Sequence, residues 1–167
     1  MTSQTEFSKP SATEIRCVRR FAADRDTLWA MWTRAEHLRN WWGPDGFTTP
    51  ICEVDFRPGG SWFYCMQDPA GQRYCGKMIY DEIDAPRRFT ARDAFTDEAG
   101  NRIEDLPESH SEFQFDEISG ETVLTNISRY HSEEARDKVI EMGVEAGLSQ
   151  TLTVWTNTSR QSPTKAS

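Results

Sequence analysis

The sequence predicts an α+β domain in which a curved antiparallel sheet wraps around a long C-terminal helix. Two patterns predict it: strand signals recur about every ten residues between 49 and 128, and a helical pattern covers Ala135–Thr156 without a proline. A third observation is the aromatic content of six Trp, nine Phe and four Tyr in 167 residues. So many large rings in a polar chain must line one dense core or a cavity.

The first elements are one strand and two short helices. Glu14–Phe21 alternates apolar and polar residues with an imperfect period of two, which indicates a strand. Asp24 can cap a helix whose apolar residues recur at helical spacings, and a second short helix should run to about Asn40. Gly43 and Pro44 cannot continue that helix, so a loop follows it.

Six further strands follow, separated by turns rich in Gly, Pro and Asp. They are Ile51–Phe56, Ser61–Gln67, Arg73–Ile83, Phe89–Phe95, Glu108–Phe115 and Thr122–Ser128. Because most of these turns are short, neighbouring strands should be antiparallel. A flat sheet would leave its aromatic face in water, so the sheet must curl around the closing helix. The order of the elements, one strand, two short helices, six strands and a long helix, is that of a helix-grip fold.

Ser132 can cap the closing helix, and two glycines lie inside it. Gly143 and Gly147 each cost about 1 kcal/mol relative to Ala, which indicates either room for a ligand or close packing against the sheet. Residues 1–12 and 159–167 are small, polar and proline-containing. We therefore expect a disordered N-terminal tail, one domain over 13–158 and a disordered C-terminal tail.

Charge and composition disfavour several classes of function. With 27 acidic and 19 basic residues the net charge is −8, which repels nucleic acid. No run of about 18 apolar residues is present, so we expect no membrane partner, and no apolar leader follows Met1, so we expect a cytoplasmic location. The four cysteines lack the paired spacing of a zinc site, and phosphate-binding and nucleophile motifs are absent. We therefore expect no metal and no cofactor, and assign no catalytic residue.

Several short motifs, in their order and spacing, resemble the START-like (SRPBCC) superfamily over Ile15–Trp155. They are Trp41-Trp42-Gly43-Pro44, Asp55-Phe56-Arg57-Pro58-Gly59-Gly60, Gly71, Gly76 with Tyr80-Asp81-Glu82-Ile83, and Gly120-Glu121-Thr122. Within the superfamily the chain is most similar to the C-terminal domain of the activator of Hsp90 ATPase. The resemblance implies a hydrophobic cavity between sheet and helix that takes an apolar small-molecule ligand. The chain lacks the additional N-terminal domain of the eukaryotic co-chaperones, which argues against an Hsp90-type chaperone as partner.

The strand pattern and the resemblance together give a set of candidate cavity-lining residues. They are Trp41, Trp42, Phe56, Trp62, Tyr64, Met66, Tyr74, Met78, Tyr80, Asp93, Phe95, Phe113, Met142 and Ala146. Trp41 and Trp42 fit a gate over the cavity and fit packed core equally well. Asp93 is the best carboxylate for acid–base work if its setting is apolar, the alternative being an Asp paired with an Arg.

We expect binding of a hydrophobic or amphipathic small molecule, and two alternatives stay open. One is an enzyme of the cyclase, hydratase or hydrolase kind that uses a tyrosine, Asp93 or His110 in the same cavity. The other is a chaperone-interacting module whose outer sheet face exposes Phe63 and Ile79. A homodimer through an unpaired strand edge is also open. Cys65 and Cys75 should face each other across a hairpin, and in a cytoplasm we expect both as thiols.

Overall fold

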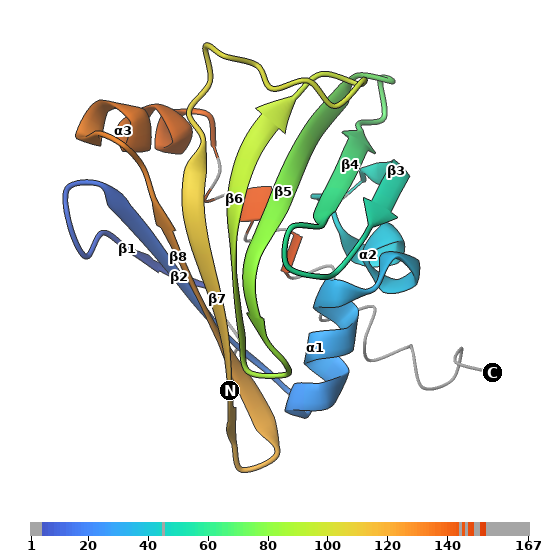
Figure 1. Ribbon diagram of the computed structural model, residues 1–167, viewed down its shortest axis with the longest axis vertical. Coiled ribbons are helices and arrows are strands. Elements are labelled where there is room, and N and C mark those ends of the chain that lie inside the picture. The colour runs from blue at the N-terminus through green and yellow to red at the C-terminus, as the bar shows by residue number, and fades with distance from the viewer. Residues whose placement is uncertain (1–4, 45, 144, 146, 149–150, 153–167) are drawn as a thin grey trace.

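The computed structural model describes residues 5–44, 46–143, 145, 147–148 and 151–152. One eight-stranded antiparallel sheet forms the body of the molecule, in the order β1-β2-β8-β7-β6-β5-β4-β3 (Figure 1). Its strands are β1 (Glu6–Ser8), β2 (Glu14–Phe21), β3 (Thr48–Val54), β4 (Ser61–Gln67), β5 (Arg73–Asp84), β6 (Arg88–Thr96), β7 (Ser109–Ile118) and β8 (Glu121–Arg129). The helices are α1 (Arg25–Thr33), α2 (Ala35–Trp41) and α3 (Glu133–Glu141). The expected α+β class with a curved sheet is confirmed.

Helices α1 and α2 cover one side of the sheet, and we call that side the concave face. Helix α2 contacts β3, whereas α1 contacts β7 and β8. Leu28 and Trp32 of α1 and Leu38 and Trp41 of α2 are buried in the core between helices and sheet. Within the described ranges, no helix is long and apolar enough to cross a membrane.

The N-terminal segment contains a strand where the sequence analysis expects only a tail. Phe7 of β1 pairs with Cys17 of β2, so β1 forms one edge of the sheet. Arg19 of β2 helps to hold the N-terminal segment in place, because its guanidinium donates a 2.9 Å hydrogen bond to the Thr5 hydroxyl. A polar strand of three residues is too short to show a period of two, and the sequence pattern therefore missed it.

The closing helix is interrupted, which corrects the expectation of one helix over Ala135–Thr156. Helix α3 ends at Glu141, and Gly143 takes the left-handed conformation with φ +88°. Its amide donates to the Ile140 carbonyl at 2.9 Å, a common way for a helix to end at glycine. Beyond the break the chain returns to the core, where Leu152 is 1% exposed.

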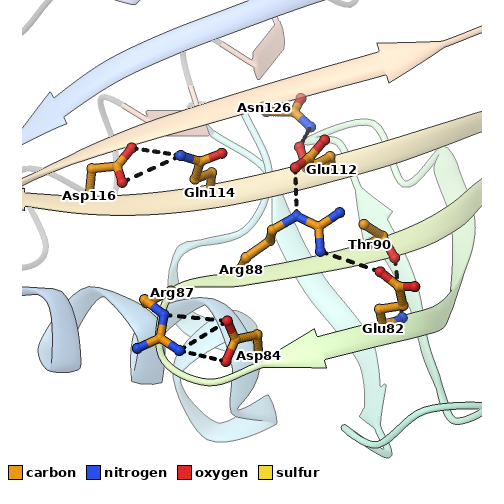
Figure 2. Close-up of polar contacts among 9 residues, drawn as sticks. All are labelled: Glu82, Asp84, Arg87, Arg88, Thr90, Glu112, Gln114, Asp116 and Asn126. Atoms are coloured by element: carbon orange, nitrogen blue, oxygen red, sulfur yellow. Dashed lines mark hydrogen bonds and ion pairs between the residues drawn. The ribbon is translucent and has the colours of Figure 1, made fainter.

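The outer face of the sheet is polar and its charges pair with one another. Figure 2 shows Arg88 of β6 between Glu112 of β7 and Glu82 of β5, with N···O distances of 2.6 and 3.3 Å. Nearby, Arg87 pairs with Asp84 at the turn between β5 and β6. Exposed pairs of this kind contribute about 0–1 kcal/mol each. This face is therefore solvated, and its contacts do not drive folding.

The outer aromatic patch expected at Phe63 and Ile79 is partly covered. Both side chains are half-buried, and a Cβ built on Gly100 of the β6–β7 connection would lie 3.8 Å from the Phe63 ring. A groove of about 380 Å³ remains there, lined by Glu53, Val54, Asp55, Ser61, Phe63, Lys77, Ala99 and Gly100. The apolar surface open to a protein partner is thus smaller than the alternation pattern suggests.

The β4–β5 hairpin carries a disulfide on this outer face. Cys65 and Cys75 are direct partners in the register, and their sulfurs are bonded at 2.09 Å. The expected position across the hairpin is confirmed, whereas the expectation of two thiols is wrong for this structure. The remaining cysteines, Cys17 and Cys52, are free and buried.

Candidate ligand-binding site

The strand register decides which side chains share the concave face. Trp62 pairs with Met78 and Tyr64 with Gly76 across β4 and β5, as the hairpin pattern predicts. Met78 in turn pairs with Asp93 of β6, which pairs with Ser109 of β7. Because side chains directly opposite each other lie on the same face, one row of the concave face runs from Trp62 to Ser109.

One part of the concave face, the aromatic end, is densely packed with rings. It comprises Trp29, Trp32, Trp41, Trp42, Phe56, Trp62, Tyr80, Phe89, Phe113 and Phe115. Trp42 lies 4.8 Å from Trp62 and 6.0 Å from Trp32 between ring centroids, with the planes near perpendicular. Trp41 fixes the end of α2, because its indole nitrogen donates a 2.8 Å hydrogen bond to the Met31 carbonyl. These contacts are typical of a packed core.

The other part, the polar end, lies at the end of the sheet nearer α3. It comprises Asp93, Ser109, Ser111, Asn126, Ser128 and Tyr130. Ser111 Oγ lies 3.2 Å from Ser109 Oγ and 3.0 Å from Ser128 Oγ, so the three hydroxyls form a chain across β7 and β8. These hydrogen bonds among the three serines satisfy the buried Ser109 and Ser111 hydroxyls.

Tyr64 joins the two ends. Its ring centroid lies 5.5 Å from Trp42 and 4.8 Å from Trp62. Gly76 makes this position available, since a Cβ there would lie 2.5 Å from the Tyr64 hydroxyl and 2.7 Å from Cζ. The hydroxyl end of the ring therefore lies against the backbone of β5 at Gly76, close enough to Asp93 to respond to its charge.

Asp93 is the ionisable group of the polar end. Burial raises the pKa of its carboxyl to about 7, and a hydrogen bond from the Ala94 backbone offsets a small part of the rise. Its charge acts on three tyrosines. Burial is the main cause that raises the pKa of Tyr64, Tyr80 and Tyr130, and Asp93 raises each of them further, following Cys52 in the case of Tyr80. The pKa of Tyr130 reaches about 12, with Ser109 and Ser128 lowering it slightly. Asp93 therefore lies among phenol hydroxyls that stay protonated near neutral pH.

The two ends differ in how closed they are. Trp62, Tyr80, Phe89 and Phe115 are at most 2% exposed. In contrast, seven concave-face residues toward the polar end keep part of their surface open, namely Tyr64, Met66, Asp93, Phe95, Asn126, Ser128 and Tyr130. Each end also has exceptions, since Trp29, Trp42 and Phe56 of the aromatic end are half-buried and Ser109 and Ser111 of the polar end are buried.

Most of the predicted site residues are either buried or half-buried. Trp41, Trp62, Met78, Tyr80 and Phe113 are buried core, whereas Trp42, Phe56, Tyr64, Met66, Asp93 and Phe95 are half-buried. Trp41 and Trp42 also line a cleft of about 230 Å³ at the connection between α2 and β3, so the loop is both packed and accessible.

Two predicted site residues, Tyr74 and Met142, are exposed. Tyr74 is 43% exposed near the tip of the β4–β5 hairpin, where its ring contacts Phe47 and its hydroxyl donates a hydrogen bond to Asp68. Met142 is 46% exposed at the end of α3. Ala146 lies outside the described residues. Tyr74 lies too near the hairpin tip to be enclosed, and the end of α3 at Glu141 leaves Met142 in solvent.

His110, the alternative general base, faces away from this site. It lies next to Ser109 along β7, so its side chain points to the outer face, where Nε2 is 3.2 Å from Asp81. His110 and Asp93 therefore cannot act on one ligand. Of the described residues, no group of three His, Cys, Asp or Glu could hold a metal ion.

Sequence reasoning missed Tyr130 and the three serines of the polar end. They lie at the end of β8 and on β7 and β8, whereas the aromatic pattern drew attention to β4 and β5. The signal available was alternation: Ser109, Ser111 and Phe113 share one face of the same strand.

Comparison with known proteins identifies the relatives of this chain. A family model described as "Activator of Hsp90 ATPase homolog 1-like protein" matches residues 22–157. The crystal structure of protein Ms6760 from Mycobacterium smegmatis is similar, with 30% identity, a TM-score of 0.85, and 92% of this chain and 95% of that chain covered. A protein from Arthrobacter aurescens, solved by NMR in solution, shows 31% identity, a TM-score of 0.81, and 89% and 87% coverage.

The crystal structure of the AHSA1 protein from Silicibacter pomeroyi shares the fold at 24% identity, with a TM-score of 0.71 and coverage of 88% of this chain and 97% of that one. A search of curated protein sequences gives no match.

Proposed function

This chain belongs to the family of Activator of Hsp90 ATPase homolog 1-like proteins, and we propose that it binds a hydrophobic or amphipathic small molecule at the polar end of its concave face. The observation that supports this most is the set of half-buried residues there, which includes Tyr64, Met66 and Phe95. Apolar rings with a few convergent polar groups are typical of small-molecule sites. Asp93 and the serine hydroxyls supply those polar groups.

The position of the ligand follows from the neighbouring rings. Tyr64 offers its open face beside Trp42, which lines the cleft at the α2–β3 connection. An apolar body resting on Tyr64 and Phe95 would place its polar group near Asp93, because Phe95 and Asp93 lie two residues apart on the same face of β6.

A fluorescent apolar dye, N-phenylnaphthylamine, tests this proposal directly. We expect saturable binding by the wild-type protein, and native mass spectrometry should show a retained small molecule after gentle purification. Ser128→Phe places a ring in the half-open surface and should weaken dye binding about tenfold or more, because it occupies the same space. The matched control is Thr125→Phe on the outer face of the same strand, which should leave binding within about twofold. Equal weakening by both variants, or no dye binding at all, would overturn the proposal.

An enzyme acting in the same place is the second candidate, and one observation favours it. A carboxyl with a pKa of about 7 is suited to proton transfer near neutral pH. Any small molecule recovered from the protein is the first compound to incubate with it, with Asp93→Asn as the inactive control. Turnover by both proteins, or by neither, would contradict this candidate.

Several expectations stay predictions. They are the cytoplasmic location, the absence of nucleic-acid, membrane and Hsp90 partners, and the possibility of a homodimer. The Cys65–Cys75 disulfide makes the location testable, since the cytoplasm keeps most protein thiols reduced. Acid quenching of cells, followed by alkylation of the denatured protein, should label all four cysteines if the cytoplasmic proposal holds. Labelling of only Cys17 and Cys52 would contradict it.

A further inference from the structure

The polar end holds a carboxyl group for which the described residues provide no counter-charge. Among the residues that the structure describes, Asp93 makes no ion pair and no side-chain hydrogen bond, and only the Ala94 backbone amide supports its charge. Its neighbours along β6, Arg92 and Ala94, point to the outer face, where Arg92 faces Asp81. The cations of the neighbouring strand β5, Arg73 and Lys77, lie on that outer face as well.

Arg19 is a cation on the concave face, but it lies far from Asp93. It is on β2, and β8 and β7 separate β2 from β6 in the sheet. Arg19 pairs with Leu124, whose partner on β7 is Phe115, whereas Asp93 pairs with Ser109 at the opposite end of β7. Arg19 therefore does not neutralise Asp93.

The groups that do surround Asp93 are aromatic rings and hydroxyls. Tyr64 of β4, Tyr80 of β5 and Tyr130 after β8 all respond to its charge. Tyr80 Oη is buried and has no hydrogen-bond partner in the described part of the chain. The π faces of tyrosine attract cations, and they do so more strongly where water is excluded.

We propose that this site selects amphiphiles that carry a protonated amine, with the ammonium group against Asp93 and the apolar body along Tyr64 and Phe95. The inference rests on the proposed function and specifies its ligand class. Three properties of the chain support it: an unpaired carboxyl, the rings around it, and a net charge of −8 that attracts cations. A carboxylate ligand would meet repulsion at the same place, and a neutral alcohol would leave the ionised Asp93 without a counter-charge.

Linkage to pH separates an amine from a neutral ligand. A bound cation favours ionised Asp93, so amine affinity should rise as the pH increases toward 7 and then level off. A neutral ligand excludes water and favours the protonated carboxyl, so its affinity should stay constant or fall over the same range. The other titratable groups near this face do not ionise there: the pKa values of Tyr64, Tyr80, Tyr130 and Cys17 are all raised well above neutral.

The experiment compares tryptamine with tryptophol, which share an indole and differ in amine and alcohol. Titration calorimetry at about pH 8 should give tryptamine an affinity about tenfold or more above that of tryptophol, and the ratio should shrink about tenfold at pH 5.5, where Asp93 is protonated. Asp93→Asn should abolish the preference and its pH dependence, so that tryptamine and tryptophol bind with affinities within about threefold of each other. The matched control is Asp81→Asn, which removes the same charge from the outer face and should keep the preference intact.

The outcomes distinguish the two proposals. Equal affinities for the two probes at pH 8, or a preference that survives in Asp93→Asn, overturn amine selection even if N-phenylnaphthylamine still binds. Binding of the dye without either indole probe also overturns it and leaves the proposed function standing. Failure of all three compounds to bind overturns the proposed function, and the inference with it. Asp93→Ser is a second variant with a small neutral side chain, should Asp93→Asn fold poorly.

Discussion

The aromatic end and the polar end of the concave face differ in the kind of contact that their side chains make. At the aromatic end, rings from α1, α2, four strands and the connections beside them contact one another at centroid distances such as the 4.8 Å between Trp42 and Trp62. At the polar end, hydroxyls form a chain between β7 and β8 beside a carboxyl that the described residues do not pair. The first arrangement stabilises the fold. In the second, the ionised form of Asp93 is unfavourable in the folded protein when no ligand is bound. The two sets of residues meet in the row from Trp62 to Ser109, so packed rings and polar groups lie side by side on this face.

The largest expected effect lies at the aromatic end. Trp62→Ala removes a side chain that is 1% exposed and contacts both Trp42 and Tyr64, so the free energy of unfolding should fall by about 4 kcal/mol. Tyr74→Ala, on the same face but 43% exposed, should cost less than about 1 kcal/mol. Urea denaturation of both variants measures the difference. Similar losses would mean that the aromatic end is not the main source of stability.

At the polar end, removing the charge of Asp93 should stabilise the protein. Its pKa is raised in the folded state, so the folded protein holds a proton that the unfolded chain releases between about pH 4 and pH 7. Stability therefore falls as the pH rises through this window. A rise from 3.8 to about 7 corresponds to roughly 4 kcal/mol at full ionisation, and hydration of a half-buried group lowers this to about 2 kcal/mol.

Asp93→Asn should accordingly raise the free energy of unfolding by about 2 kcal/mol at pH 8, and the gain should disappear toward pH 4. Denaturation at both pH values measures it. If Asp93→Asn raised the free energy of unfolding equally at both pH values, Asp93 would have an ordinary pKa. The two ends would then differ only in how their side chains pack.

The contact that joins the ends is expected to have a smaller effect. Gly76→Ala places a methyl group 2.5 Å from the Tyr64 hydroxyl, so the ring must move, at a cost of about 1–2 kcal/mol. The double variant with Tyr64→Leu should recover part of this loss, because the clash is removed. Additive losses in the double-mutant cycle would mean that Gly76 does not hold Tyr64 in place.

The smallest effect concerns the serine chain. Ser111→Ala removes hydrogen bonds to Ser109 and Ser128 and should cost about 1 kcal/mol without changing the pH dependence of stability. Thermal denaturation at two pH values checks both parts. A change in pH dependence would show that the hydroxyl chain, and not burial alone, sets the ionisation of Asp93.

The hairpin and the closing helix show how far the sequence could predict this fold. Alternation in Ser61–Gln67 and Arg73–Ile83, with a short turn between them, predicts the register that the structure has. The helix break at Gly143 was not predictable, because a single glycine inside a helical pattern is compatible with both continuation and termination. For the candidate site, the pattern predicts Tyr64 and Asp93 on the enclosed face, and it misses Tyr130, which comes from the far end of β8.

The sequence by itself determined the class of fold, the order of the strands along the chain and the two faces of each strand, because these depend on local periodicity and on turn chemistry. Only the tertiary structure decided what surrounds Asp93. Tyr64 reaches it because Gly76 on the next strand lacks a side chain, and Tyr130 reaches it because β7 and β8 are paired. These neighbours come from segments far apart in the chain, and the pKa of a carboxyl depends on the burial and charge that they create together.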